Sequence, residues 1–187
     1  MFYVLLALRA LMREKGYFTA QTQPRLDQWV DLVALGTVAD VVKLDKNNRI
    51  LVAQGLKRVR AGKALPGLSA LFTVARKKTE AASVRDFGFA IGPRINAAGR
   101  LSSMESGIEC LLADQETVAL SFAQELNLFN SERQELETEM QQCAEEVIAS
   151  CNMSERYTLS LFNEHFNEGV VGLVASRVKD RIHRPVF

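Results

Sequence analysis

The stretch ETVALSFAQELNLFNSERQELETEMQQCAEEVIAS, residues 116–150, decides the fold expected for this chain. It contains no glycine or proline and is rich in Glu, Gln, Leu and Ala, which favour helix. Ser131 with Gln134 resembles a capping box, so the stretch is either one long helix or two helices that meet near residues 130–131. In its first half, apolar residues recur every three positions, at Leu120, Ala123, Leu126 and Phe129.

The second half of this stretch carries only a narrow apolar stripe. Much of it is therefore expected to face solvent, and a long, largely polar helix typically bridges two masses. The sequence predicts that residues 114–152 form a connecting helix or helix pair between residues 1–113 and a further unit at residues 153–187. The stripe consists of Leu136, Met140, Cys143 and Val147.

Residues 1–113 are expected to be rich in helices. The apolar pattern from Phe2 to Met12 predicts a mostly buried helix that ends near Gly16, and the surface it covers is expected outside this sequence. WVDLVALGTVADVV, residues 29–42, fits either a helix end or a buried strand. Further elements expected here are a turn at residues 45–48, a helix that stops at Gly62, a helix opened by Pro66, and a capped loop at residues 79–83.

After the long stretch the chain has the pattern of a βαβ unit. YTLSLFN, residues 157–163, predicts a strand. EGVVGLVASRVKDRIHRPVF, residues 168–187, predicts a glycine turn, a helix and the start of a second strand. The fold class expected for the whole chain is therefore α/β, with two incomplete domains joined by the long helix.

The bulk composition predicts a soluble protein with a packed core. The chain has 187 residues, is 48% hydrophobic and carries a formal net charge of +1. This charge argues against a polybasic protein but allows a local basic stripe that binds nucleic acid. The three cysteines form no C-x-x-C pair, which argues against zinc and indicates free thiols in a reducing cytosol. The N-terminal apolar run is too short to span a bilayer and lacks the features of a signal peptide.

The stretch GTVADVVKLDKNN, residues 36–48, places Asp40 among small and β-branched residues. A carboxylate there is costly unless it lies at the end of an element and has a partner. One interpretation is an aspartate that caps a helix or a turn. The other is a ligand to Mg²⁺ or Mn²⁺, which prefer oxygen donors. A two-metal site needs several ligands from different segments, so the pattern alone favours the cap.

The stretch GPRINAAGR, residues 92–100, is a second candidate site. It predicts a loop in which glycines and alanines let another backbone approach closely. Arg94 and Arg100 could pair with phosphate oxygens, and Asn96 could donate or accept hydrogen bonds. The alternative is that both arginines make internal ion pairs and the glycines make turns.

A third candidate is NEGVVGLVASRVKDR, residues 167–181, where Gly169 and Gly172 precede a predicted helix. The helix N-terminus could bind an anion, although the stretch is neither a Walker A loop nor G-x-G-x-x-G. The pattern favours a plain strand-to-helix turn in which Gly172 allows close packing. A cationic face is expected from Arg177, Lys179, Arg181 and Arg184.

Three segments together, residues 32–56, 87–101 and 168–186, resemble the RecJ family of the DHH phosphoesterase superfamily, which are single-stranded-DNA-specific exonucleases. The resemblance runs from FYVLLALR, residues 2–9, to residue 186, and it is more specific than any one motif. It implies that residues 1–113 are the C-terminal part of a DHH domain. It also implies that a DHH-associated domain begins around Tyr157, after the connecting helix.

The resemblance gives the candidate residues roles in a nuclease. It implies that Asp40 is the last acidic ligand of a Mn²⁺ or Mg²⁺ pair that activates water for phosphodiester hydrolysis. It implies that Arg94, Asn96 and Arg100 hold single-stranded DNA near that site. The activity implied is 5′→3′ cleavage in cytoplasmic DNA repair and recombination, with a single-strand-binding protein or a helicase as partners.

The chain also departs from the family pattern. It contains no Asp-His-His triplet, and Phe166 to Gly169 stand where the family often has Trp-His-Pro-Gly. The Gly-Ser-x-Arg-Ser-like loop expected late in the second domain is also missing. We therefore expect a central fragment of such a nuclease that is inactive alone. The alternatives are a non-catalytic RecJ-like module that binds nucleic acid, and a phosphodiesterase of the same superfamily for small nucleotides.

Overall fold

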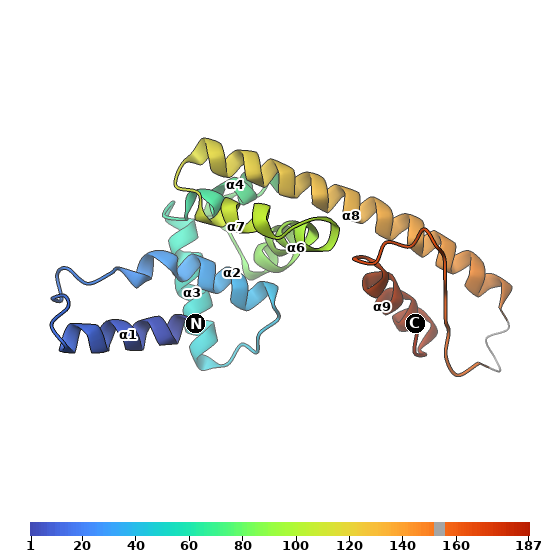
Figure 1. The fold of residues 1–187 in the computed structure, drawn as a ribbon, viewed down its shortest axis with the longest axis horizontal. Coiled ribbons are helices and arrows are strands. Elements are labelled where there is room, and N and C mark those ends of the chain that lie inside the picture. Colours follow the sequence, from blue (N-terminus) through green and yellow to red (C-terminus); the bar gives the residue numbers. More distant parts are fainter. Residues whose placement is uncertain (152–155) are drawn as a thin grey trace.

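The computed structural model describes residues 1–151 and 156–187, and these residues are mainly helical. Figure 1 shows an N-terminal body, a long helix that leaves it, and a smaller C-terminal unit near the far end of that helix. The helices are α1 (Phe2–Glu14), η1 (Leu26–Trp29), α2 (Val30–Ala39), α3 (Lys46–Arg60), α4 (Pro66–Val74), η2 (Thr79–Ala81), α5 (Val84–Asp86), η3 (Phe87–Ile91), α6 (Gly92–Leu101), α7 (Glu105–Leu112), α8 (Glu116–Ser150) and α9 (Val171–Ile182).

The N-terminal body has one apolar core, which α2 to α7 and the first half of α8 enclose. Phe72 of α4 and Phe87 of η3 meet edge to face, with ring centroids 6.1 Å apart. Cys110 is fully buried in this core, where burial raises the pKa of its thiol to about 11. The largest fully buried side chains of the core are Phe72, Phe87, Leu68, Leu71, Ile91 and Leu126.

Several local predictions for this body are confirmed, and one is wrong. Residues 30–39 form helix α2 rather than a strand, and Pro66 is the first residue of α4. Ser83 precedes α5 and caps its start through a capping box with Asp86. The turn predicted at residues 45–48 is wrong, because the Asp45 carboxylate accepts a hydrogen bond from the Asn48 N–H and the chain enters α3 directly.

Helix α1 forms as predicted and ends before Gly16, which has a φ of +78°. It lies to one side of the N-terminal body (Figure 1), and none of its residues is buried within this chain. Two hydrogen bonds from its arginines hold it to the following loop: Arg9 donates to the Pro24 carbonyl at 3.1 Å, and Arg13 donates to the Gln23 side chain at 3.2 Å.

Helix α8 is continuous from Glu116 to Ser150, so the alternative of two helices is wrong. The Ser131 hydroxyl donates to the carbonyl of Asn127 within the helix, instead of capping a new one. The first half of α8 packs on the N-terminal body through small and apolar residues, and Met140 and Ala144 of its second half pack on α9. The long helix therefore contributes to two separate apolar clusters.

The α/β prediction is not confirmed, because the described residues contain no strand longer than an isolated bridge. Leu159 and Val186 form that bridge, and it is parallel, as a βαβ unit requires. The Leu159 N–H donates to Pro185 at 3.0 Å and the Phe187 N–H donates to Leu159 at 2.9 Å. Two short segments alone do not make a stable sheet, so the predicted strands remain a local pairing.

No helix in residues 1–151 and 156–187 is both long enough and apolar enough to cross a membrane.

Candidate active-site edge and nucleic-acid interface

Asp40 lies at the C-terminal end of α2, where it is exposed to solvent. Its side chain makes no hydrogen bond or ion pair with any residue that the structure describes. The carboxylate also lies near the negative end of the helix dipole, where an acidic group is unfavourable. The side chain therefore does not act as a cap, unlike that of Asp45 five residues later.

The backbone just after Asp40 is strained. The Val41 N–H donates to Val38 and the Val42 N–H donates to Thr37, which is the bond pattern of a Schellman motif. This motif needs a left-handed residue that is usually glycine, but here it is Val41, with a φ of +54°. A β-branched residue in this conformation costs about 1–3 kcal/mol. An unpaired carboxylate and a strained residue thus stand side by side, which is typical of a functional site.

The end of α2 lies against the start of α6. A Cβ added at Gly92 would lie 3.2 Å from the Cβ of Ala39, so the two helices approach closely there. The segment Phe87–Ile91, which leads directly into α6, is a π-helical turn, a feature often found at functional sites. This contact brings Asp40 next to the segment that begins the second candidate site.

The described residues contain no group of three or more His, Cys, Asp or Glu that could hold a metal ion. Asp40 fits a divalent metal chemically, since it is an exposed and unpartnered oxygen donor. It supplies one ligand, however, and a metal pair needs several.

The stretch GPRINAAGR is helical, so the prediction of a loop is wrong. It forms α6, with Pro93 in the first turn, where proline is tolerated because that N–H needs no partner. A helix distributes the three candidate residues over different sides. Asn96 and Arg100 are exposed and lie one turn apart, whereas Arg94 is half-buried against α8.

Arg94 has internal partners. Its Nε donates to the side-chain oxygen of Asn127 at 3.0 Å, and its Nη1 donates to the carbonyl of Ala90 at 2.6 Å. Burial lowers the pKa of the Arg94 guanidinium from its ordinary value. The alternative of internal contacts is thus the one observed for Arg94, although they are hydrogen bonds rather than ion pairs. These bonds hold α6 on α8.

Asn96 and Arg100 share a hollow of about 180 Å³ with Arg133 of α8. Pro93 and Leu173 complete its lining, so three helices, α6, α8 and α9, meet around it. The Arg100 Nη1 donates to the carbonyl of Gly169 at 2.9 Å. The structure therefore brings two of the three predicted residues together and adds an arginine that the sequence did not single out.

Arg133 is held by a buried acid, Glu137. Glu137 is 3% exposed, accepts a hydrogen bond from Arg133 at 2.5 Å and forms an ion pair with Arg177 of α9 at 2.8 Å. Arg133 also donates to the side chain of Asn130 at 3.0 Å. The sequence could have predicted this ion pair, because Arg133 and Glu137 are four residues apart in a predicted helix. Their burial, however, depends on α9.

The two glycines near the start of α9, Gly169 and Gly172, have roles that differ from the prediction. A Cβ added at Gly169 would lie 2.0 Å from the backbone oxygen of Arg100, so this position needs glycine. Gly172 is the second residue of α9, and a Cβ added there would have no atom within 4 Å apart from its chain neighbours and its own helix. Close packing thus requires Gly169 and not Gly172.

The predicted cationic face of α9 is largely neutralised. Arg177 pairs with Glu137, and Arg181 pairs with Glu145 at 2.7 Å, so both join α9 to the acidic side chains of α8. Lys179 pairs with the neighbouring Asp180 at 3.0 Å. These cations mainly serve contacts within the chain.

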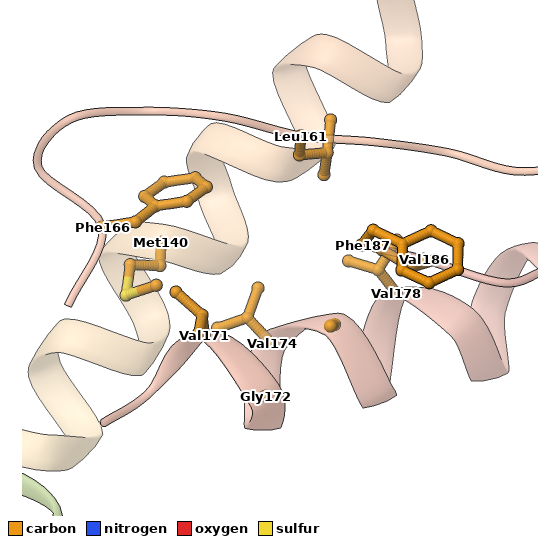
Figure 2. Close-up of a pocket in the computed structure, with 10 residues that line it drawn as sticks. Met140, Leu161, Phe166, Val171, Gly172, Val174, Val178, Val186 and Phe187 are labelled. Carbon is orange, nitrogen blue, oxygen red and sulfur yellow. The ribbon is translucent and has the colours of Figure 1, made fainter. Parts of the chain in front are cut away.

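A second cavity, of about 210 Å³, lies between α8, α9 and the C-terminal segment. Figure 2 shows Met140 of α8, Val174 of α9 and Phe187 of the C-terminal segment around it, together with Phe166 from the segment that precedes α9. The lining contains no charged residue. Its chemistry therefore does not suit a phosphate group, in contrast to the hollow beside Arg100.

We compared the sequence and the fold of this chain with those of known proteins. No family model matches the chain. Single-stranded-DNA-specific exonucleases named RecJ from Dickeya dadantii and Escherichia coli are each 46% identical to it over 194 aligned residues. These alignments cover all of this chain and 33% of each relative, so the chain spans about a third of their length.

Solved structures agree with the sequence comparison. The crystal structure of Thermus thermophilus RecJ in complex with Mg²⁺ has a TM-score of 0.79 and 34% identity, and covers 96% of this chain and 27% of that one. A structure of exonuclease RecJ bound to manganese also has a TM-score of 0.79, with 33% identity, and covers 96% of this chain and 43% of that one.

Proposed function

From the premise that this chain is homologous over its whole length to one segment of the RecJ exonucleases, we propose that it forms part of a metal-dependent nuclease for single-stranded DNA. The observation that carries the proposal is the joint match of sequence and fold along the chain. In this proposal residues 1–113 belong to a DHH domain, residues 114–152 connect, and residues 153–187 begin a DHH-associated domain.

Asp40 is proposed to be one ligand of the metal site. Its carboxylate is exposed and unpaired at a helix end beside strained Val41, and a bound cation would offset its unfavourable position. The related structures contain Mg²⁺ or Mn²⁺. When bound, a divalent metal pair supplies an activated water and stabilises charge on the phosphoryl group. The other ligands are expected outside the residues described here.

The hollow beside α6 is proposed to hold the DNA strand. Arg100 uses one nitrogen for the Gly169 carbonyl, which orients the guanidinium while leaving other donors for a phosphate. Asn96 lies one turn away with its amide unpartnered among the described residues. Arg94 contributes from behind this face, because its bonds to Asn127 and Ala90 position α6.

A segment exchange tests the proposal. This chain would replace the corresponding third of the Escherichia coli relative, and degradation of 5′-phosphorylated single-stranded DNA would be measured with Mn²⁺. We expect the chimera to be active and Asp40→Asn to lower its rate by about a hundredfold or more, because metal-based stabilisation is worth several kcal/mol. Asp45→Asn is the matched control, since Asp45 caps α3 and is expected to affect stability only.

An active chimera whose Asp40→Asn variant retains full activity would contradict the metal role. The isolated chain is expected to degrade no DNA, because it offers one carboxylate where several are needed.

A second candidate function is a nucleic-acid-binding module without catalysis. The lack of a three-ligand cluster in the described residues favours it for this chain taken alone. An inactive chimera combined with DNA binding by the isolated chain would support it. Action in cytoplasmic DNA repair and recombination, beside a single-strand-binding protein or a helicase, stays a prediction, as does the hydrolysis of small nucleotides.

A further inference from the structure

The N-terminal body contains a strongly basic stretch that the proposed site does not use. Between Lys57 and Arg85 the chain has eight basic residues and one acidic residue, Glu80. The basic residues fall in two groups, one at residues 57–63 around the end of α3 and one at residues 76–85 after α4. A near-neutral chain that gathers so much positive charge in one stretch indicates a local function for it.

The fold brings the two groups together. The Arg60 Nε donates at 2.7 Å to the carbonyl of Ala82, which ties the last turn of α3 to the segment after α4. The Lys63 N–H donates to the carbonyl of Arg58, so the turn after α3 folds back onto the same corner. We call this surface the basic corner, defined by Lys57, Arg58, Arg60, Lys63, Arg76, Lys77, Lys78 and Arg85.

Most of this charge has no acidic partner. Arg58 lies 3.5 Å from Asp31, and Lys77 lies 3.9 Å from Asp86. The other six cations are exposed and make no ion pair within the part of the chain that the structure describes. The negative end of α3 explains cations in its last turn, but it does not reach residues 76–85. The exposed cations outside that last turn therefore have neither a helix dipole nor an ion pair to offset their mutual repulsion among the described residues.

The basic corner is also hollowed. A cavity of about 350 Å³ lies there, and Lys57, Arg58 and Lys63 line it together with the apolar side chains of Val30 and Ala61. Gln54 and Asp27 complete the lining, and the Asp27 carboxylate is paired with Arg25 at 2.9 Å. An apolar floor with cations at its rim suits a sugar–phosphate backbone.

We propose that the basic corner binds the phosphate backbone of a nucleic-acid strand, as a contact additional to the hollow beside α6. The choice of a nucleic acid over an acidic peptide follows from the spread of the cations over two segments, which matches a long chain of regularly spaced charges. The choice of nucleic acid as the ligand rests on the proposed function.

The test measures binding of this chain to a labelled oligothymidylate of about 20 nucleotides by fluorescence anisotropy, over salt concentrations from about 50 to 200 mM. The variant is Lys63→Gln with Lys78→Gln. The matched control removes two charges elsewhere, through Lys15→Gln with Lys179→Gln. All four lysines are exposed, so thermal denaturation is expected to show intact folding in both variants.

We expect the corner variant to weaken binding several-fold at low salt. We also expect it to make the dependence of log K on log salt shallower by about 1 to 1.5, because each lost phosphate contact on a single strand removes about 0.7. The control is expected to match the unmodified chain. Equal behaviour of the two variants would overturn the inference, as would a lack of DNA binding by the unmodified chain. Binding of oligoglutamate in place of DNA would also overturn it, by pointing to an acidic protein partner.

Arg100→Gln separates this inference from the proposed function. If only Arg100→Gln weakens binding, the hollow beside α6 binds DNA and the basic corner does not. If only the corner variant weakens binding, the inference stands and the proposed role of Arg100 is wrong.

Discussion

Among the residues that the structure describes, each half of the molecule buries one carboxylate, and the two are stabilised in different ways. Glu137, at the junction of α8 and α9, forms short ion pairs with Arg133 and Arg177, and the one with Arg133 is also a hydrogen bond. Asp31, in the N-terminal body, accepts backbone N–H bonds from Leu32 and Leu65 at 3.0 and 3.1 Å. Its nearest cation, Arg58, lies 3.5 Å away, and the Arg58 Nε is buried without a hydrogen-bond partner.

This difference shows which interactions stabilise each region. The N-terminal body has a broad apolar core, so an imperfect ion pair at Asp31 is tolerated within it. The junction has a small apolar cluster, and charged contacts from Glu137 and Glu145 supplement it. We therefore expect the docking of α9 to be sensitive to charge, and the body to be sensitive mainly to packing.

The largest effect is expected from Glu137→Ala, which removes the acid from the junction. It leaves Arg133 and Arg177 without their shared partner, and we expect a loss of about 2–3 kcal/mol in the stability of the α8–α9 contact. Breaking a buried pair typically costs 3–5 kcal/mol, and the exposure of Arg177 reduces this. Hydrogen exchange of α9 amides would measure it.

Glu139→Ala provides the control for this measurement. Glu139 lies on the same helix but is exposed, and it has no ion pair in the described part of the chain. Equal protection of α9 in both variants would show that apolar packing alone holds the junction.

A smaller effect is expected from the pH dependence of Asp31. Burial raises the pKa of its carboxyl, with the backbone bonds and Arg58 acting against this. A raised folded-state pKa means that its contribution to stability is fully present below the ordinary pKa of about 3.9 and is lost as pH rises through the folded value. The stability of the unmodified chain minus that of Asp31→Asn should therefore fall across this range in urea titrations.

Asp27→Asn tests the direction of this pH dependence. The hydrogen bond from Arg25 lowers the pKa of Asp27, so its contribution is present above the ordinary value and is lost as pH falls through the folded one. If Asp31 and Asp27 show the same direction, the burial argument for Asp31 is wrong.

The smallest effect on stability is expected at Val41, the left-handed residue that follows the exposed Asp40. Val41→Gly should raise stability by about 0.5–1 kcal/mol, because relief of the left-handed strain exceeds the entropy cost of glycine. Val42→Gly, one residue further, is expected to lower stability, since Val42 is not left-handed. Thermal unfolding of both variants checks this, and a loss of stability in Val41→Gly would show that position 41 is unstrained.

Local features of the sequence were sufficient to predict most helices and the resemblance to RecJ. Residues 116–150 lack helix breakers, Pro66 suits a first helical turn, and Ser83 lies three residues before Asp86, so short-range bonds within these segments decide their structure. The three quoted segments indicated the RecJ resemblance, which the comparisons confirm. Asp40 could be identified as a candidate site residue from the sequence, because it is a charged residue in an apolar stretch.

Other features were decided only by the tertiary structure, because they depend on residues far apart in the chain. Gly92 to Arg100 could have been a loop, and packing on α8 made it a helix that turns Arg94 inward and leaves Asn96 and Arg100 outward. Gly169 is required by the backbone of Arg100, which lies 69 positions earlier. The sequence by itself therefore determined most helices and the resemblance to RecJ, and long-range contacts determined which side chains share a site.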